Sequence, residues 1–244
     1  MTPRILKSLL LTPLILTLSA PVSSSQNDPA REWHHLYIEI RDRLITKEEG
    51  LRKLKELEVL LKDFYSKKSE KTQEDRLCFP LKGYSSQAIG GKGGNGYQPQ
   101  GYDFFEGNDH KGHPGHDLFI LDKNQDGIDD KTGKPVEVLS ACPGIVVSTN
   151  LNWTPSSPIR GGNYIWTYEP IQSQYYYYAH LSEIFVRIGQ IVSRGESLGT
   201  VGRTGVKAYP RRSPTHLHFV VHHSTDGYPK PINSYVELVR SNRE

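Results

Sequence analysis

Apolar and polar positions follow two different rhythms along the chain. Between residues 28 and 67 the apolar residues recur every three or four positions, as they do on one face of an α-helix. From Cys78 onward Gly, Pro and Tyr are frequent, and the apolar residues gather in short runs separated by turn signals. The pattern therefore predicts an N-terminal helical segment followed by a β-rich domain.

Two helices are predicted in the first part. One covers residues 30–44, and the second begins at Thr46, where Glu49 gives the three-residue spacing of a capping box. The second helix carries a stripe of leucines on one face, formed by Leu51, Leu54, Leu57, Leu60 and Leu61. We predict that this stripe packs against the first helix or the main domain, because the repeat is short for the alternative, a coiled-coil dimer. We interpret the hairpin as an accessory element, since no catalytic residue type is suitably placed in it, and the polar run after it as a solvated linker.

Short β-type runs make up most of the second part. The candidate strands cover residues 116–121, 135–139, 144–149, 164–168, 174–180 and 216–221. A Gly-rich stretch at residues 89–107 is too flexible to be the core of a strand. It is either a loop that borders a site or an inert surface loop.

The first residues have the layout of a secretory signal peptide. Arg4 and Lys7 precede an apolar stretch at residues 9–20, which is followed by small residues. An uncleaved membrane anchor is the alternative, but a span needs about 20 apolar residues and Pro13 interrupts this stretch. We predict a signal peptide over residues 1–25 and export of the protein to the periplasm or the medium.

Charge totals and cysteine usage narrow the function classes. The 30 Lys and Arg residues nearly balance the 27 Asp and Glu residues, so no large basic face for nucleic acid is indicated. The two cysteines, Cys78 and Cys142, belong to no paired metal-binding motif. In an oxidising compartment they could pair, and two separate buried thiols are the equal alternative.

The sharpest local signal is a pair of histidines in the last predicted strand. His216 and His218 stand two positions apart among β-branched and aromatic residues, so the alternation of a strand puts both on one face. Two imidazoles at this spacing can serve one metal site, as two ligands or as one ligand and one base. The alternative is a pair of surface histidines without chemistry.

A second cluster combines a nitrogen and an oxygen ligand. His113 and Asp117 lie four positions apart around Pro114-Gly115, which disfavours a helix and predicts a turn that folds His113 back towards Asp117. Such a donor mix suits zinc with an open coordination position for water. His116 is expected on the opposite side of the strand, and His110 is expected to be a loop histidine rather than a ligand.

A third candidate ends a run of four tyrosines. His180 follows Tyr175-Tyr176-Tyr177-Tyr178-Ala179, a predicted strand with phenol groups on both faces. By itself a histidine at this place would usually be structural, and it gains weight from the other two clusters.

Together these three pieces resemble the lysostaphin-like, or LytM-type, zinc metallopeptidases that cut peptidoglycan peptides. The family pattern is H-x-x-x-D, then a histidine at a strand end, then H-x-H, and this chain has the three pieces in that order. The Gly-punctuated passage 188–205 also resembles the family's stretch before H-x-H. The resemblance covers about residues 79–239.

The resemblance implies a role for each matching residue. His113, Asp117 and His218 would hold zinc, and His180 and His216 would form the catalytic pair. It also implies a mainly antiparallel β fold with a catalytic groove across the sheet. Since no position of the set is missing, it favours an enzyme that hydrolyses peptidoglycan crosslinks or bridges over a catalytically silent wall-binding module or activator of other wall hydrolases.

The chain departs from the family pattern directly after Asp117. The insert contains Asp122, Asn124 and Asp126, whose oxygens at alternate positions resemble the first part of a calcium-binding EF-hand loop. Gly133 stands where the loop's bidentate Glu is expected, so an acidic solvated turn is the equal alternative. A calcium-dependent surface interaction protein would use this loop as its main site.

The predicted organisation is thus a signal peptide over residues 1–25, a helical hairpin and linker over 26–76, and a zinc metallopeptidase domain over 77–244. The expected partner is peptidoglycan peptide, with neither nucleic acid nor a stable membrane span after signal cleavage. The sequence leaves the bond cleaved and the oligomeric state open.

Overall fold

The computed structural model describes residues 28–69, 77–210 and 213–241. Its helices are α1 (Pro29–Arg41), α2 (Lys47–Lys68) and α3 (Tyr235–Arg240), with two 3-10 helices, η1 (Ser86–Ala88) and η2 (Phe104–Asp109). Among the described residues, no helix combines the length and the apolar character that a membrane span requires. The predicted signal peptide lies outside the described residues.

The two predicted helices are present and are capped as the sequence indicates. The Asp28 side chain accepts from the amide of Ala30 at the start of α1, and the Thr46 hydroxyl accepts from the amide of Glu49 at 3.2 Å at the start of α2. Helix α1 ends at Arg41 rather than at residue 44, because Arg43 adopts a left-handed backbone with a φ of 58°. Leu54, Leu57 and Leu61 of the leucine stripe are buried, whereas Leu60 is 48% exposed.

In the described part of the chain nine strands form one sheet in which all neighbours are antiparallel, which confirms the predicted fold class. They are β1 (His116–Phe119), β2 (Glu137–Leu139), β3 (Gly144–Asn150), β4 (Asn163–Glu169), β5 (Gln174–Ile184), β6 (Ile191–Val192), β7 (Ser197–Val201), β8 (His216–Thr225) and β9 (Tyr228–Ile232). The main order is β1-β8-β5-β4-β3-β6; β7 joins β2 to β5, and β9 pairs with β8. The sequence analysis did not predict β6, β7 and β9. Strand β6 is short, β7 contains Gly199, and β9 contains two prolines, which suit an edge strand.

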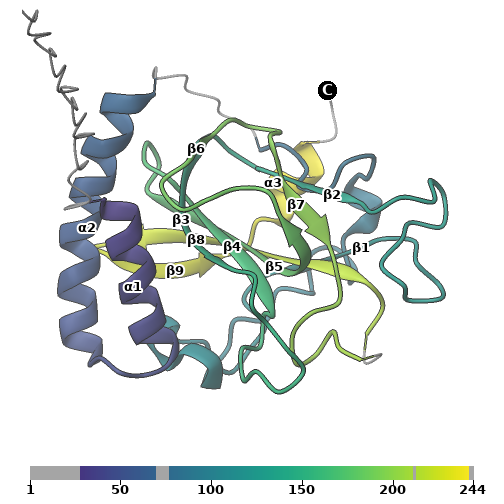
Figure 1. Cartoon of the computed structure of the whole chain (residues 1–244), viewed down its shortest axis with the longest axis horizontal. Helices are drawn as coiled ribbons and strands as arrows, with labels where there is room; N and C mark the ends of the chain where they lie inside the picture. Colours follow the sequence, from purple (N-terminus) through teal and green to yellow (C-terminus); the bar gives the residue numbers. More distant parts are fainter. Residues whose placement is uncertain (1–27, 70–76, 211–212, 242–244) are drawn as a thin grey trace, which may run out of the picture.

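The helical pair packs on one face of this sheet and shares a core with it (Figure 1). Trp33 of α1 is fully buried and lies against Trp166 of β4 and Tyr175 of β5, with ring centroids 5.7 and 5.3 Å away. The opposite face packs against a second core that includes Tyr176, Tyr178 and Phe219. The tyrosine run of β5 therefore supplies both cores, as the alternation of a strand requires.

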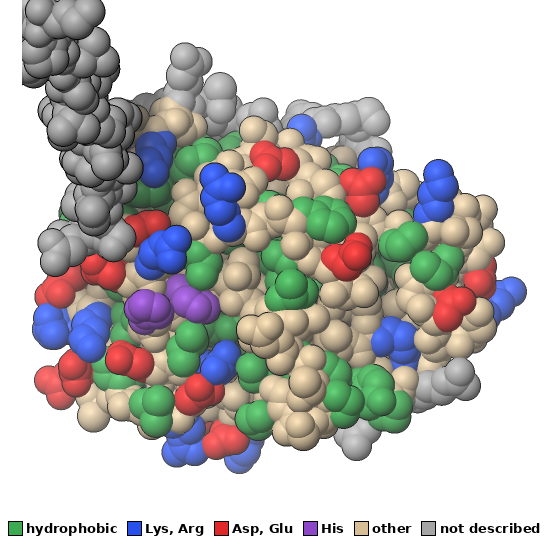
Figure 2. Space-filling view, viewed as in Figure 1, with side chains coloured by type: hydrophobic (Ala, Val, Ile, Leu, Met, Phe, Trp, Pro, Cys, Tyr) green, Lys and Arg blue, Asp and Glu red, His purple; other side chains and the backbone are tan. Residues whose placement is uncertain are grey.

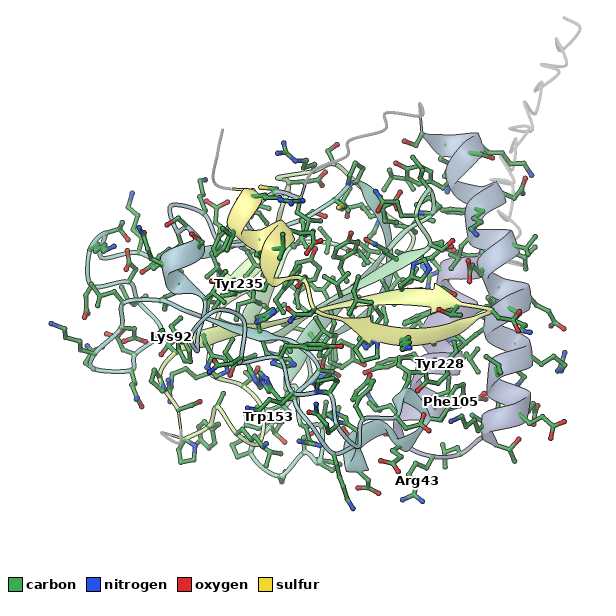
Figure 3. All side chains as sticks on the ribbon, turned by 180° about the vertical axis from the view of Figure 1, so that it is seen from behind. Arg43, Lys92, Phe105, Trp153, Tyr228 and Tyr235 are labelled. Carbon is green, nitrogen blue, oxygen red and sulfur yellow. The ribbon has the colours of Figure 1, made fainter. Side chains whose placement is uncertain are left out.

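Polar contacts hold α2 against the η2 segment and the β8–β9 hairpin. Figure 3 shows Phe105 and Tyr228 together beside α2, and the Lys47 ammonium lies over both rings. Lys47 also pairs with Asp103 at 2.5 Å, and Lys55 pairs with Asp226 at 2.6 Å. The helical pair is therefore built into the fold, although the predicted boundary at residue 77 stays a prediction.

Positive and negative side chains alternate over the helical face of the molecule (Figure 2). On the face seen in this view they are mixed rather than gathered in a patch of one sign.

Candidate metal centre

Strand register brings the candidate ligands together at one end of the sheet. The pairing of β1 with β8 puts Asp117 directly opposite His218, and the pairing of β8 with β5 puts His218 opposite Ala179, next to His180. His216 lies on the same face of β8 as His218 because every second side chain of a strand points to the same face. Three strands that are far apart in sequence thus place four of the five candidate residues side by side.

His113 reaches the group through the predicted turn. The backbone of His113 pairs with that of Gln98, with both N–H groups donating to the partner's carbonyl at 2.6 and 2.8 Å. Gly115 allows the chain to pass close to β8, because a Cβ there would lie 2.3 Å from the carbonyl oxygen of Phe219. The Gly-rich stretch 89–107, for which the sequence left two alternatives, borders the site: its Gly96 carbonyl accepts from His113 Nδ1 at 2.7 Å.

Nitrogen atoms of two histidines converge on one carboxylate oxygen. His113 Nε2 lies 3.1 Å and His218 Nδ1 2.9 Å from Asp117 Oδ1. Among the described residues this is the one group of three or more His, Cys, Asp or Glu side chains with all ligand atoms within 4.8 Å of one another. Ligands around a zinc ion, each at about 2 Å from it, lie roughly 3 Å apart, so the spacing fits such an ion.

The hydrogen-bonding pattern of His113 also fits a cation. Since the Gly96 carbonyl can only accept, His113 Nδ1 carries the proton, and Nε2 of the neutral ring presents a lone pair. That lone pair faces an acceptor oxygen of Asp117 at 3.1 Å. Two acceptors at this distance need a proton or a cation between them, and zinc would supply the charge.

His180 and His216 form a second pair beside the candidate ligands, with ring centroids 4.9 Å apart. Each ring is oriented by a backbone carbonyl: His180 Nδ1 donates to Thr204 and His216 Nδ1 donates to Pro214, both at 2.7 Å. The remaining Nε2 of each neutral ring is therefore a lone pair, and that of His216 lies 3.6 Å from Asp117 Oδ1. His180 has a φ of 66°, a left-handed conformation that is uncommon outside Gly and concentrates at functional sites.

Burial and mutual contacts set the charges in the site. Burial, with the proximity of His216 and His218, lowers the pKa of His180 to about 3, and burial also lowers the pKa of His218. Burial would raise the pKa of Asp117, but hydrogen bonds from His113 and His218 outweigh it and hold that pKa far below its usual range. The hydrogen bond with Asp117 raises the pKa of His113. An ionised Asp117 is the protonation state that a zinc ligand requires, and a zinc ion would take the place of the proton that the raised pKa of His113 puts between the two side chains.

The five side chains line a groove with a volume of about 260 Å³. Among the described residues, Asp117, Arg160 and Lys207 are its charged lining. A smaller cavity of about 60 Å³ continues the groove past Arg160 towards the helical pair, where Arg41 of α1 and several aromatic rings line it. With zinc bound, the lining carries more positive than negative charge.

Two further histidines lie outside the candidate ligand set. His116 is fully buried, its Nε2 pairs with the side chain of Asn233 at 3.0 Å, and Tyr97 and Tyr235 pack against its ring. His110 lines the groove, but its ring packs edge-on against Tyr102 and it supplies no ligand atom to the group of three.

The predicted calcium site is not supported. Both oxygens of Asp122 are occupied by protein donors: Oδ1 accepts from the amide of Asp126, and Oδ2 accepts from the amide of Gly127 and the hydroxyl of Thr215. The Asn124 side-chain amide donates to Asp126 at 2.8 Å, and the second Asp126 oxygen accepts from the amide of Ile128. The acidic positions that suggested calcium thus accept hydrogen bonds from the amides of their own turn and, at Asp122, from Thr215 as well.

Residues 123–233 match the model of peptidase family M23. The match includes His180, His216 and His218 and begins after His113 and Asp117. It confirms the resemblance to the lysostaphin-like, LytM-type peptidases. No curated protein matches the chain.

Several solved structures are similar to this chain. A zinc-containing peptidase from Vibrio cholerae is 23% identical, with a TM-score of 0.43, and the match covers 66% of this chain and 40% of that one. Lysostaphin from Staphylococcus simulans is 21% identical over 61% of this chain and 51% of its own, with a TM-score of 0.38. A protein described as a putative peptidase M23 from Pseudomonas aeruginosa is 16% identical over 76% and 60%, with a TM-score of 0.43. The matches span less than two thirds of each relative.

Proposed function

From the match of residues 123–233 to peptidase family M23, we propose that this protein is an exported zinc endopeptidase that hydrolyses peptide crosslinks or bridges of bacterial peptidoglycan. The observation that carries the proposal is the convergence of His113 and His218 on Asp117 Oδ1, with His180 and His216 beside them. Three protein ligands are the number found in catalytic zinc sites, which keep one position open. Structural zinc sites usually have four protein ligands.

The metal would be held by His113 Nε2, His218 Nδ1 and Asp117. Zinc bound by these residues would supply Lewis acidity toward a water molecule and the scissile carbonyl. The Gly96 carbonyl holds His113 in the tautomer that points Nε2 at the metal position. Asp117 is ionised and supplies the negative charge of the ligand set.

His180 and His216 would manage the proton and the developing charge. Because Thr204 and Pro214 fix the hydrogens of both rings on Nδ1, both Nε2 atoms are free to accept a hydrogen bond from the attacking water. A ring that has taken up the proton can donate it to the departing amine or to the oxyanion. Backbone carbonyls orient both rings before substrate arrives, so little reorganisation is needed.

The groove charge favours a particular class of peptide. Arg160 and Lys207 line it, and the one carboxylate in its lining belongs to the candidate metal ligand Asp117. Stretches of substrate that carry a free carboxylate near the cleaved bond would therefore be bound better than amidated ones. Peptidoglycan peptides are the substrate class that the family resemblance implies.

The decisive experiment digests purified peptidoglycan of defined crosslink type and identifies the products by mass spectrometry. The full-length mature protein should contain one zinc per chain by elemental analysis. It should release peptides cut at one kind of bond, lose activity on chelation and regain it with zinc. A folded protein that binds peptidoglycan but holds no zinc and releases nothing would instead be a catalytically silent binding module or activator.

A further inference from the structure

Described residues on both sides of the segment between β7 and β8 contact the guanidinium of Arg203. The Nη2 group donates to the carbonyls of Ala208 and Ser213 at 2.9 and 3.0 Å, and the Nη1 group donates to the hydroxyl of Thr215 at 2.8 Å. Thr215 directly precedes β8 and is 1% exposed. One side chain thus joins both ends of the segment.

Asp122, in the acidic turn after β1, also contacts Thr215. The Thr215 hydroxyl donates to Asp122 Oδ2 at 2.6 Å, and Asp122 is 6% exposed. A single hydroxyl therefore accepts from a cation and donates to an anion, and both of these hydrogen bonds are charge-assisted. The backbone adds a further tie, because the amide of Ile120 donates to the Thr215 carbonyl at 3.1 Å.

The two ends of this segment carry the carbonyls that orient the proposed catalytic histidines. Thr204, next to Arg203, accepts from His180 Nδ1, and Pro214, next to Thr215, accepts from His216 Nδ1. Moving either carbonyl by a fraction of an ångström would weaken the hydrogen bond that selects the tautomer. Arg203 and Thr215 are the direct chain neighbours of these two residues, and the Thr204 hydroxyl is itself tied to Leu181 and Asn163.

We propose that Arg203, Thr215 and Asp122 are positioning residues for the catalytic pair. They hold the carbonyls of Thr204 and Pro214, and through them keep the hydrogens of His180 and His216 on Nδ1. The acidic insert after Asp117 then serves the active site as an anchor for Thr215. The inference rests on the proposed function for its kinetic consequence, whereas its geometric content does not depend on hydrolysis.

The sharpest test replaces Thr215, because two variants distinguish the effect of losing its hydroxyl from the effect of losing its packing. Thr215→Val removes the hydroxyl and keeps the shape, and Thr215→Ser keeps the hydroxyl. We expect Thr215→Val and Asp122→Asn to retain zinc and KM within about twofold and to lose kcat by roughly 10- to 100-fold, a loss of the size measured when the hydrogen-bond partners that orient active-site histidines are removed. Thr215→Ser should have a kcat within a few-fold of the wild type. The kcat of Arg203→Lys, whose side chain has a single donor nitrogen, should lie between those of the wild type and Thr215→Val.

A second readout is independent of turnover. Long-range proton–nitrogen correlation spectra of the imidazoles in the zinc-loaded protein report which ring nitrogen carries the hydrogen. The wild type should show His180 and His216 protonated on Nδ1, and Thr215→Val should show mixed tautomers at His216 in a protein that is still folded at the temperature of the measurement. Wild-type kcat and unmixed tautomers in Thr215→Val and Asp122→Asn would overturn the inference. A wild type that hydrolyses nothing would instead refute the proposed function and leave the spectral test standing.

Discussion

The imidazole rings of His113 and His218 lie edge to face with their centroids 4.8 Å apart, and both present a nitrogen to the same oxygen of Asp117. One ring is delivered by a turn and the other by a central strand, so their meeting depends on the register of β1 and β8. A one-residue slip of that register would turn His218 to the opposite face. The candidate metal centre is therefore a direct product of strand pairing.

The helical pair is expected to be indispensable for the fold. Removing residues 1–76 would expose the buried face of β3, β4 and β5, including Val147, Tyr164 and Trp166, so the remaining chain should aggregate or unfold. A finer test is Trp33→Ala, which should lower the free energy of unfolding by about 3–5 kcal/mol. Chemical denaturation measures this change.

A matched control for Trp33 lies on the exposed side of the same helical pair. Leu60 is 48% exposed, so Leu60→Ala should change stability by no more than about 0.5 kcal/mol. If the chain beginning at Leu77 proved monomeric, folded and zinc-loaded, the interpretation of the hairpin as an accessory element would be right, and the shared core would be dispensable.

The positive lining of the groove predicts a preference for carboxylates. Two synthetic peptides that differ only by a carboxylate or a carboxamide next to the cleaved bond should differ several-fold in KM, with the carboxylate bound better. Arg160→Gln and Lys207→Gln should each reduce the ratio, and raised salt should reduce it for the wild type. Steady-state kinetics measure the ratio, and equal KM values for both peptides would contradict the assignment.

The chemistry of the site was visible in the sequence because it resides in side chains with strong spacing signals. The spacing of His113 and Asp117 and that of His216 and His218 indicate a metal site, and the strand alternation around these residues is regular. His180 was visible only through the family resemblance, since a single histidine after a tyrosine run has no spacing of its own. These two pairs and His180 are brought together by long-range strand pairing, which local sequence patterns do not encode.

The parts that the sequence missed are mostly backbone contacts. The carbonyls of Thr204 and Pro214 orient two histidines, yet any residue type offers a carbonyl, so no signal marked them. The calcium site predicted in the acidic turn is not supported for a related reason. Side-chain oxygens at alternate positions accept hydrogen bonds from backbone amides in a turn as readily as they bind calcium. Only the contacts of Asp122 with Gly127 and Thr215 distinguish the two.

Buried His222 should make the protein sensitive to acid. Burial, together with the proximity of His110 and His218, lowers the pKa of His222 to about 3 from an ordinary value of 6.5. The unfolded chain therefore takes up a proton at this residue as the pH falls below 6.5, whereas the folded chain does so only near 3. The contribution of neutral His222 to the free energy of unfolding is thus fully present above pH 6.5 and is lost as the pH falls towards about 3, by at most roughly 1.4 kcal/mol per pH unit.

The variant His222→Phe tests this, because a phenyl ring suits the aromatic surroundings of Phe104 and Trp166 and does not titrate. Denaturation of the zinc-free wild type and variant between pH 7 and pH 4 should show a shallower loss of stability in the variant. Zinc is omitted so that its pH-dependent release does not contribute. Parallel curves would show that His222 is not held neutral in the folded protein.

The central claim is the division of five residues into metal ligands and a catalytic pair. Single Ala variants of each of these residues and of the control His116 are purified, and zinc content and cleavage of purified peptidoglycan are measured side by side. The variants are His113→Ala, Asp117→Ala, His180→Ala, His216→Ala, His218→Ala and His116→Ala. Replacing a ligand removes binding free energy for the metal, whereas replacing His180 or His216 removes a group that acts on the water and the oxyanion.

The most direct measurement is therefore the zinc-to-protein ratio of these variants, read beside their cleavage rates. We predict that the ligand variants lose zinc and activity together, that His180→Ala and His216→Ala keep zinc while hydrolysis falls by about 100-fold or more, and that His116→Ala keeps both. Loss of zinc from His216→Ala with retention by His218→Ala would reverse the assignment within β8. Full zinc and full activity in all six variants would contradict the account.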